Sequence, residues 1–145
     1  MIPELMKKII LILIIVLTSF FKNTQAQVPD TLIYLKSIVN KKSFYIGKPF
    51  SVLMDSLKIQ IKHFSQNTDI YRDISKETST SFGFYFPLTA DDIYLAYPRL
   101  RISWQSYLNA NQSWNLYRNN NGGGWSPVVK AFYATGIVAD IRILE

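Results

Sequence analysis

The chain has 145 residues, of which 48% are hydrophobic, 14% aromatic and 18% charged, and its formal net charge is +6. This composition predicts a folded core rather than a disordered chain, and the length is enough for one compact domain. Cysteine is absent, which excludes disulfides, thiolate nucleophiles and cysteine metal ligands.

Residues 1–26 predict a secretory signal peptide. The basic pair Lys7 and Lys8 precedes an apolar run from Ile9 to Phe21, and a small residue, Ala26, follows. The apolar run has 13 residues, fewer than the roughly 20 that a helix needs to cross the hydrocarbon core, so a membrane anchor is the weaker alternative. We therefore expect cleavage after Ala26, a secreted or periplasmic protein, and no membrane span after cleavage.

Two amphipathic helices are predicted next. After Asp30, which suits a helix N-cap, apolar residues share one helical face: Leu32, Leu35, Ile38 and Val39. In the second helix Pro49 suits the first turn, and apolar residues follow at i, i+3, i+4 and i+7: Phe50, Leu53, Met54 and Leu57.

Strands are predicted over most of the remaining chain, because apolar and polar residues alternate there: 59–64, 80–86, 91–104 and 137–144. Pro98 interrupts the third of these segments, which indicates a bulge or an edge position. Residues 65–79 are polar, and we interpret them as a surface excursion with one helical turn.

Residues 105–126 predict a long polar connection. Within it, Ser113–Tyr117 predicts a short strand, and Arg118–Trp125 reads RNNNGGGW. Asparagine and glycine reach positive φ easily, so this stretch fits a hairpin or a mobile loop better than a phosphate-binding loop. The following segment, 127–135, fits either a helix capped by Ser126 or a strand rich in Val, Phe and Tyr, and the strand is favoured.

The order of helix, helix and then strands, without regular alternation, predicts an α+β fold. We expect residues 27–145 to form a small single domain. In it, two N-terminal helices pack on one face of a mainly antiparallel sheet of four to five strands.

Residue sets for catalysis or metal binding are not evident in the sequence. His63 is the single histidine, and a histidine at a strand end is more often a boundary residue than a general base. Asp91 and Asp92 are adjacent and would point to opposite faces of a strand, while Asp69 and Asp73 lie four apart. We expect no catalytic residue, no metal and no cofactor, and the sequence favours a protein that is not an enzyme.

The late strands carry charges on one face. Arg99 and Arg101 alternate with apolar residues, and Asp140 and Arg142 share a face of the last strand. We expect Asp140 to bridge an arginine across the ladder, and an anion site is the alternative. The predicted cleavage removes three lysines and one glutamate, which leaves a dispersed net charge of +4, so nucleic acid is not expected as a partner.

Aromatic residues gather around the long connection, among Asn, Gln and Ser: Trp104, Tyr107, Trp114, Tyr117 and Trp125. Such rings suit a sugar ring or a peptide segment, and the alternative is that they pack as a satellite core. The sequence thus predicts an exported non-catalytic domain that binds a cell-surface glycan, peptide or protein through these residues. The alternatives are a structural or interaction domain with buried tryptophans, and a hydrolase or hydrolase inhibitor.

Overall fold

The computed structural model describes residues 3–4, 6–8, 30–69, 71–85 and 97–145. The chain divides into two units, Met1–Asp30 and Thr31–Glu145. The apolar run from Ile9 to Phe21 and the expected cleavage site at Ala26 lie outside the described residues, so the signal peptide stays a prediction. No helix within the described ranges is both long enough and apolar enough to cross a membrane.

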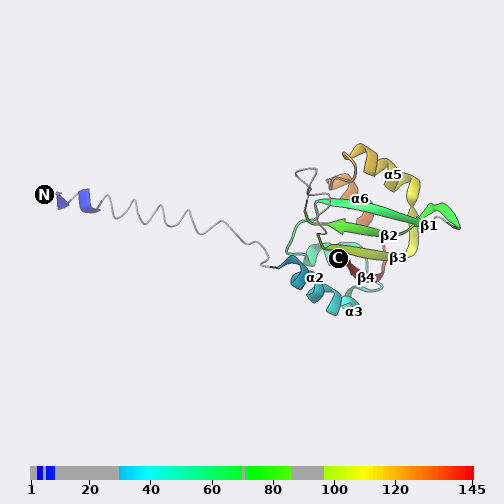
Figure 1. Ribbon diagram of the computed structural model, residues 1–145, viewed down its shortest axis with the longest axis horizontal. Coiled ribbons are helices and arrows are strands. Elements are labelled where there is room, and N and C mark those ends of the chain that lie inside the picture. Colours follow the sequence, from blue (N-terminus) through cyan, green and yellow to red (C-terminus); the bar gives the residue numbers. More distant parts are fainter. Residues whose placement is uncertain (1–2, 5, 9–29, 70, 86–96) are drawn as a thin grey trace. The chain divides into compact units, whose positions relative to one another are not determined.

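The second unit is an α+β domain built on a four-stranded antiparallel sheet (Figure 1). The strands lie side by side in chain order: β1 (His63–Asp69), β2 (Asp73–Gly83), β3 (Arg99–Asn109) and β4 (Val138–Leu144). Each neighbouring pair is antiparallel. The expected α+β class is confirmed, and the described part of the chain contains four strands rather than five.

Helices precede the sheet and also interrupt it. Three come before β1: α2 (Thr31–Asn40), α3 (Lys42–Tyr45) and α4 (Phe50–Ser56). Two more lie between β3 and β4: α5 (Ala110–Asn119) and α6 (Pro127–Ala134). Helices α2 and α4 confirm the two predicted from periodicity, but the expected arrangement of two N-terminal helices on the sheet is too simple. Helices α2 and α3 contact β4, α5 contacts the other three strands, and α4 contacts α6.

The hydrophobic core lies between these helices and one face of the sheet. The strand register places Phe64, Phe82 and Leu100 opposite one another on three adjacent strands, and all three are buried. Helices supply the facing side chains, which include Leu35, Ile38, Tyr45, Phe50, Leu53, Val129 and Tyr133. Successive residues of a strand point to opposite faces of the sheet. The polar residues that alternate with Phe64, Phe82 and Leu100 therefore lie on the other face.

The interpretation of residues 65–79 as a surface excursion is wrong. These residues form most of a β-hairpin, in which Ser65 pairs with Ser81 and Gln66 with Thr80. The segment 59–62, predicted as strand, is irregular instead. Backbone hydrogen bonds hold a strand whatever its side chains are, so a polar strand gives little signal of alternation.

The strand predicted at 113–117 is also wrong. Strand β3 runs on to Asn109, whose side chain accepts a hydrogen bond from the Gln112 backbone N–H and caps α5. Ala110 and Ser113 are buried, and Leu116 is partly buried, at spacings of three. That period is typical of one helical face, but polar neighbours obscure it.

Segment 127–135 is helical, so the preference for a strand is wrong. The Ser126 side chain accepts a hydrogen bond from the Val129 backbone N–H, and Pro127 occupies the first turn. Val129 and Tyr133, one turn apart, are both fully buried. The cap and the proline favoured a helix over the β-propensity of Val, Phe and Tyr.

The RNNNGGGW stretch joins two helices and is hydrogen-bonded to the edge of β1, so it is not a hairpin. The Gly123 carbonyl accepts a hydrogen bond from the Phe64 N–H at 2.8 Å, and the Trp125 N–H donates to the Lys62 carbonyl at 3.0 Å. Gly123 has φ of +100°, and a Cβ there would lie 2.4 Å from the Phe64 carbonyl oxygen. Glycine is therefore required at this close approach.

The last strand confirms its prediction, with one difference in detail. Ile141 is buried as expected, but Val138 is buried too, because the register shifts between Ser103 and Trp104. Asp140 does not bridge to an arginine across the ladder. Its carboxylate instead lies 2.7 Å from Lys42 Nζ and 2.8 Å from Nε of Arg142 on the same strand.

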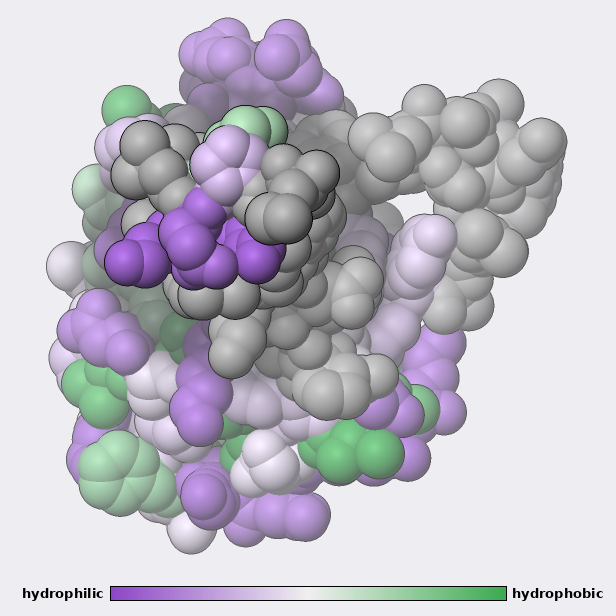
Figure 2. All heavy atoms as spheres, turned by 90° about the vertical axis from the view of Figure 1, so that its left-hand side faces the viewer, coloured by the Kyte–Doolittle hydropathy of each residue, from purple (hydrophilic) through white to green (hydrophobic). Residues whose placement is uncertain are grey.

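The described surface drawn in Figure 2 mixes hydrophilic and hydrophobic residues. On this face the hydrophobic side chains form separate small patches among hydrophilic ones. Scattered exposed hydrophobic residues are normal on protein surfaces, so the described residues drawn on this face give no indication of a binding site.

Candidate functional site

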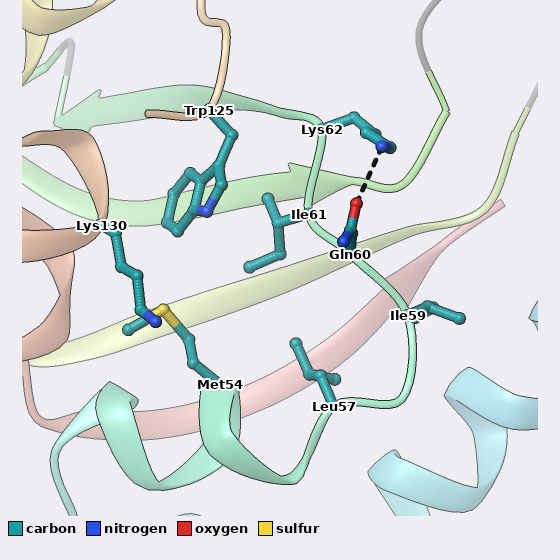
Figure 3. Close-up of a pocket in the computed structure, with 8 residues that line it drawn as sticks. All are labelled: Met54, Leu57, Ile59, Gln60, Ile61, Lys62, Trp125 and Lys130. Carbon is teal, nitrogen blue, oxygen red and sulfur yellow. Dashed lines mark hydrogen bonds between the residues drawn. The ribbon is translucent and has the colours of Figure 1, made fainter. Parts of the chain in front are cut away.

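A pocket of about 450 Å³ opens between α4, α6 and the segment that joins α4 to β1. Eight residues line it: Met54, Leu57, Ile59, Gln60, Ile61, Lys62, Trp125 and Lys130 (Figure 3). Five of these side chains are apolar, so the walls favour an apolar group. The residues come from three separate stretches of the chain, which only the folded structure brings together.

Trp125 forms one wall of the pocket, and the core holds its ring in place. The indole meets Phe82 edge to face, with ring centroids 5.7 Å apart, and lies nearly parallel to Tyr133 at 6.4 Å. Its backbone N–H donates a hydrogen bond to the carbonyl of Lys62, the residue just before β1. The indole is thus a partly buried, fixed surface rather than a freely rotating side chain.

The opposite walls come from the two helices. Met54 and Leu57 lie at the end of α4, beyond the fully buried Phe50 and Leu53. Lys130 extends from α6, and in Figure 3 its amine lies beside the Met54 side chain at the same opening. This lysine forms no ion pair with any residue that the structure describes.

The two remaining polar side chains turn away from the opening. Lys62 Nζ donates to Gln60 Oε1 at 3.1 Å, and Figure 3 shows this pair on the outer side of the segment. Lys130 is therefore the cation that borders the pocket itself, and Lys62 adds positive charge nearby.

The segment joining α4 to β1 also leaves backbone groups available. The Lys58 N–H donates to the Tyr34 hydroxyl and the Lys62 N–H to the Gly83 carbonyl, both at 2.8 Å. Between them, the backbone groups of residues 59–61 form no hydrogen bond to another described residue. Three peptide units beside an apolar pocket can thus pair with an incoming chain.

The structure separates the five aromatic residues predicted to bind a ligand. Trp104 is buried in the core, where its ring stacks on Tyr133, as the satellite-core alternative expects. Tyr117 packs edge to face on Phe64, and Trp114 stacks on Tyr117 at 5.3 Å.

The remaining two predicted residues have different surroundings. Tyr107 is exposed on β3, where the Lys76 amine lies 5.7 Å from its ring centroid. Trp125 is the member of the five that lines the pocket. Sequence reasoning missed Lys130 and Ile61, and it assigned Met54 and Leu57 only to a core face, because periodicity does not show where a helix end leaves the core.

A buried carboxyl group was also missed. Alternation would place Glu77 with Ser79 on the polar face, but the register shifts between these two residues and turns Glu77 into the core. Glu77 is 0% exposed, and its Oε1 accepts hydrogen bonds from Thr80 and, at 3.1 Å, from the Tyr133 hydroxyl. The Trp104 indole N–H donates to the same threonine oxygen at 2.9 Å.

Burial dominates the chemistry of this carboxyl. Its second oxygen, Oε2, has no hydrogen-bond partner among the described residues. Burial raises the pKa of Glu77, and the hydrogen bonds from Thr80 and Tyr133 offset only part of this rise. Burial likewise raises the pKa of Tyr133, as does the neighbouring carboxyl. The group is enclosed by the core, which indicates a structural role.

The other polar residues singled out in the sequence form no catalytic set in the described ranges. Burial lowers the pKa of His63, and so does the nearby Arg99 guanidinium. Asp69 and Asp73 accept hydrogen bonds from the backbone N–H groups of Arg72 and Ser75 at the hairpin turn. Asp91 and Asp92 lie outside the described residues. No group of three His, Cys, Asp or Glu residues in the described ranges could hold a metal ion.

Comparison of the chain with protein-family models, curated proteins and solved structures finds no match. The chemistry of the pocket is therefore the basis for a functional proposal. Apolar walls, one fixed indole, one bordering cation and free peptide groups suit the binding of a ligand.

Proposed function

We propose that this chain is an exported, non-catalytic binding domain, and that its pocket holds an apolar side chain of a peptide or protein partner. The observation that carries the proposal is the apolar pocket of about 450 Å³ beside Trp125. Export rests on the predicted signal peptide. Of the partner classes considered, glycan, peptide and protein, the pocket favours the last two.

The volume and the walls support an apolar guest. Ligand pockets in proteins commonly measure about 300 to 1,000 Å³, and this one falls within that range. A sugar ring would bring hydroxyl groups against Leu57, Ile61 and Met54, which offer them no hydrogen bond. A leucine or phenylalanine side chain would exchange water for apolar contact instead.

The backbone of residues 59–61 supports a peptide in particular. An extended peptide laid along this segment would pair its N–H and C=O groups with the unpaired ones there. Main-chain pairing would give affinity, and the pocket would select one side chain. This division of roles is typical of proteins that bind an extended peptide at an edge.

Charge supports an acidic residue next to the apolar one. Lys130 borders the opening without an ion pair in the described part of the chain, and Lys62 lies on the same segment as the free peptide groups. A carboxylate beside the guest side chain would meet the positive charge of Lys130, and Lys62 adds to the positive potential nearby.

Capped pentapeptides with a central leucine or phenylalanine between glutamates test the proposal. We expect them to bind the full chain more tightly than the same peptides with lysines, as measured by isothermal titration calorimetry. Leu57→Ala and Lys130→Glu should weaken binding. The matched controls Val128→Ala, on the exposed side of α6, and Lys41→Glu should leave it unchanged.

Three results would contradict the proposal. One is equal affinity for acidic and basic peptides, which would remove the role of Lys130. Another is equal loss of affinity in the pocket variants and their controls. The third is competition of neutral oligosaccharides with the peptides for binding. That result would indicate a glycan, rather than a peptide, as the ligand of the pocket.

A further inference from the structure

The second face of the sheet carries aligned rows of polar side chains. The strand register places one residue from each strand in a row: Ser65, Ser81, Arg101 and Arg142. The next row contains Asn67, Ser79, Ser103 and Asp140. Side chains of both rows project from the face opposite Phe64 and Phe82, because they occupy the alternate positions of the same strands.

The described helices of this unit pack against the other face of the sheet. Each of α2 to α6 places side chains in or against the core that contains Phe64, Phe82 and Ile102. The pocket beside Trp125 belongs to that helical side as well. The polar face is thus a second surface, independent of the proposed peptide site.

Positive charge dominates this polar face. Arg101 and Arg142 lie directly opposite each other on β3 and β4, and Arg99 lies two residues before Arg101 on the same strand. The acid in the two rows, Asp140, is bound by Arg142 and also by Lys42. The single positive charge of Lys42 is enough to neutralise the Asp140 carboxylate. The three arginines therefore give this face a net charge of +3.

Arg101 is the residue that most needs an acceptor. Its Nε is buried and has no hydrogen-bond partner among the residues that the structure describes. Like charges directly opposite each other on a ladder destabilise a sheet, and an unpaired buried donor adds to that cost. A bound anion between Arg101 and Arg142 would lower the repulsion between the two guanidinium groups.

We infer that this face binds an extended anionic polysaccharide through its carboxylate or sulfate groups. Guanidinium groups bind such oxyanions with paired hydrogen bonds, and Arg99 and Arg101 repeat along the strand at about 7 Å. Ser79 and Ser81 are buried, but the partly exposed Ser65, Asn67 and Ser103 in the same rows offer partners for sugar hydroxyls. Single-stranded nucleic acid is less suited, because its binding sheets use aromatic stacking and the two rows contain no Phe, Tyr or Trp.

Binding of heparin and of polygalacturonate to the full chain tests the inference, with neutral dextran and a single-stranded DNA oligonucleotide as comparison probes. We expect heparin or polygalacturonate to bind and dextran not to bind. Arg101→Gln and Arg142→Gln should each lower the affinity about tenfold, the loss expected for one charge-assisted hydrogen-bonded pair. Arg72→Gln, in the exposed hairpin turn, removes the same charge elsewhere and should have little effect.

The variants also separate this site from the pocket and from misfolding. Arg142 is 74% exposed, so Arg142→Gln keeps the fold even where Arg101→Gln fails to fold. Leu57→Ala should leave polysaccharide binding intact. The inference is overturned by tighter binding of DNA than of either polysaccharide, by equal losses in Arg72→Gln and Arg142→Gln, or by no binding of either polyanion at low salt.

Discussion

Replacing Glu77 by glutamine should change how the stability of the domain depends on pH. The glutamine keeps the shape of the side chain and an oxygen that accepts the hydrogen bonds from Thr80 and Tyr133. It removes the group that titrates. Because the carboxyl is 0% exposed and burial raises its pKa in the folded state, the folded protein holds the proton at pH values where the unfolded chain has released it.

The magnitude and sign follow from that difference in bound protons. Below the usual glutamate pKa of 4.5, the carboxyl is protonated in both states, and its contribution to stability is fully present. Above it, the free energy of unfolding of the wild-type protein falls by up to about 1.4 kcal/mol per pH unit, until the folded-state pKa is passed. Glu77→Gln lacks this loss, so its stability relative to the wild type should rise as the pH increases.

Urea unfolding of both proteins at a series of pH values measures this difference, because every other titrating group is common to the pair. Tyr133→Phe provides a second arm. It removes a hydrogen bond that lowers the pKa of Glu77, so it should extend the loss of stability to higher pH. Parallel curves for the wild type and Glu77→Gln would refute the reasoning, as would a wild type that gains stability over the variant with rising pH.

Three further predictions concern packing, backbone and exposure. Leu53→Ala should lower the free energy of unfolding by about 2 to 5 kcal/mol in urea, whereas exposed Ile74→Ala should change it by less than about 0.5 kcal/mol. Gly123→Ala should cost more than Gly47→Ala in the same assay. Both have positive φ, but a Cβ at Gly123 meets a carbonyl oxygen at 2.4 Å and one at Gly47 meets nothing within 4 Å. Trp114→Phe should remove most of the tryptophan emission that acrylamide quenches, because Trp114 is 50% exposed; unchanged quenching would contradict its placement on the surface of α5.

Local patterns in the sequence were sufficient to predict the helices and the strand that have one apolar face. The helical spacing of Leu35 and Ile38, and of Phe50 and Leu53, predicted α2 and α4, and the alternation ending in Ile141 and Ile143 predicted β4. Each of these segments buries one side against the core. The spacing of its apolar residues in the sequence therefore matches the period of the helix or strand.

Polar elements could not be predicted in this way. The β1–β2 hairpin is stabilised by backbone pairing along residues such as Ser65, Gln66 and Asn67, whose side chains carry little periodic signal. For α6, the cap Ser126 favours a helix and the β-branched residues favour a strand. The burial of Val129 and other apolar side chains in the folded protein decides between the two.

Composition and local order by themselves determined the α+β class, the absence of thiol chemistry and the aromatic character of the chain. The tertiary structure alone decided what the aromatic residues do: it buried Trp104, exposed Trp114 and set Trp125 beside Lys130 and Met54. It also turned Glu77 into the core through a shift of strand register. The physical reason is that a site is a meeting of side chains from distant segments, and the register and packing that bring them together are properties of the whole fold rather than of any one segment.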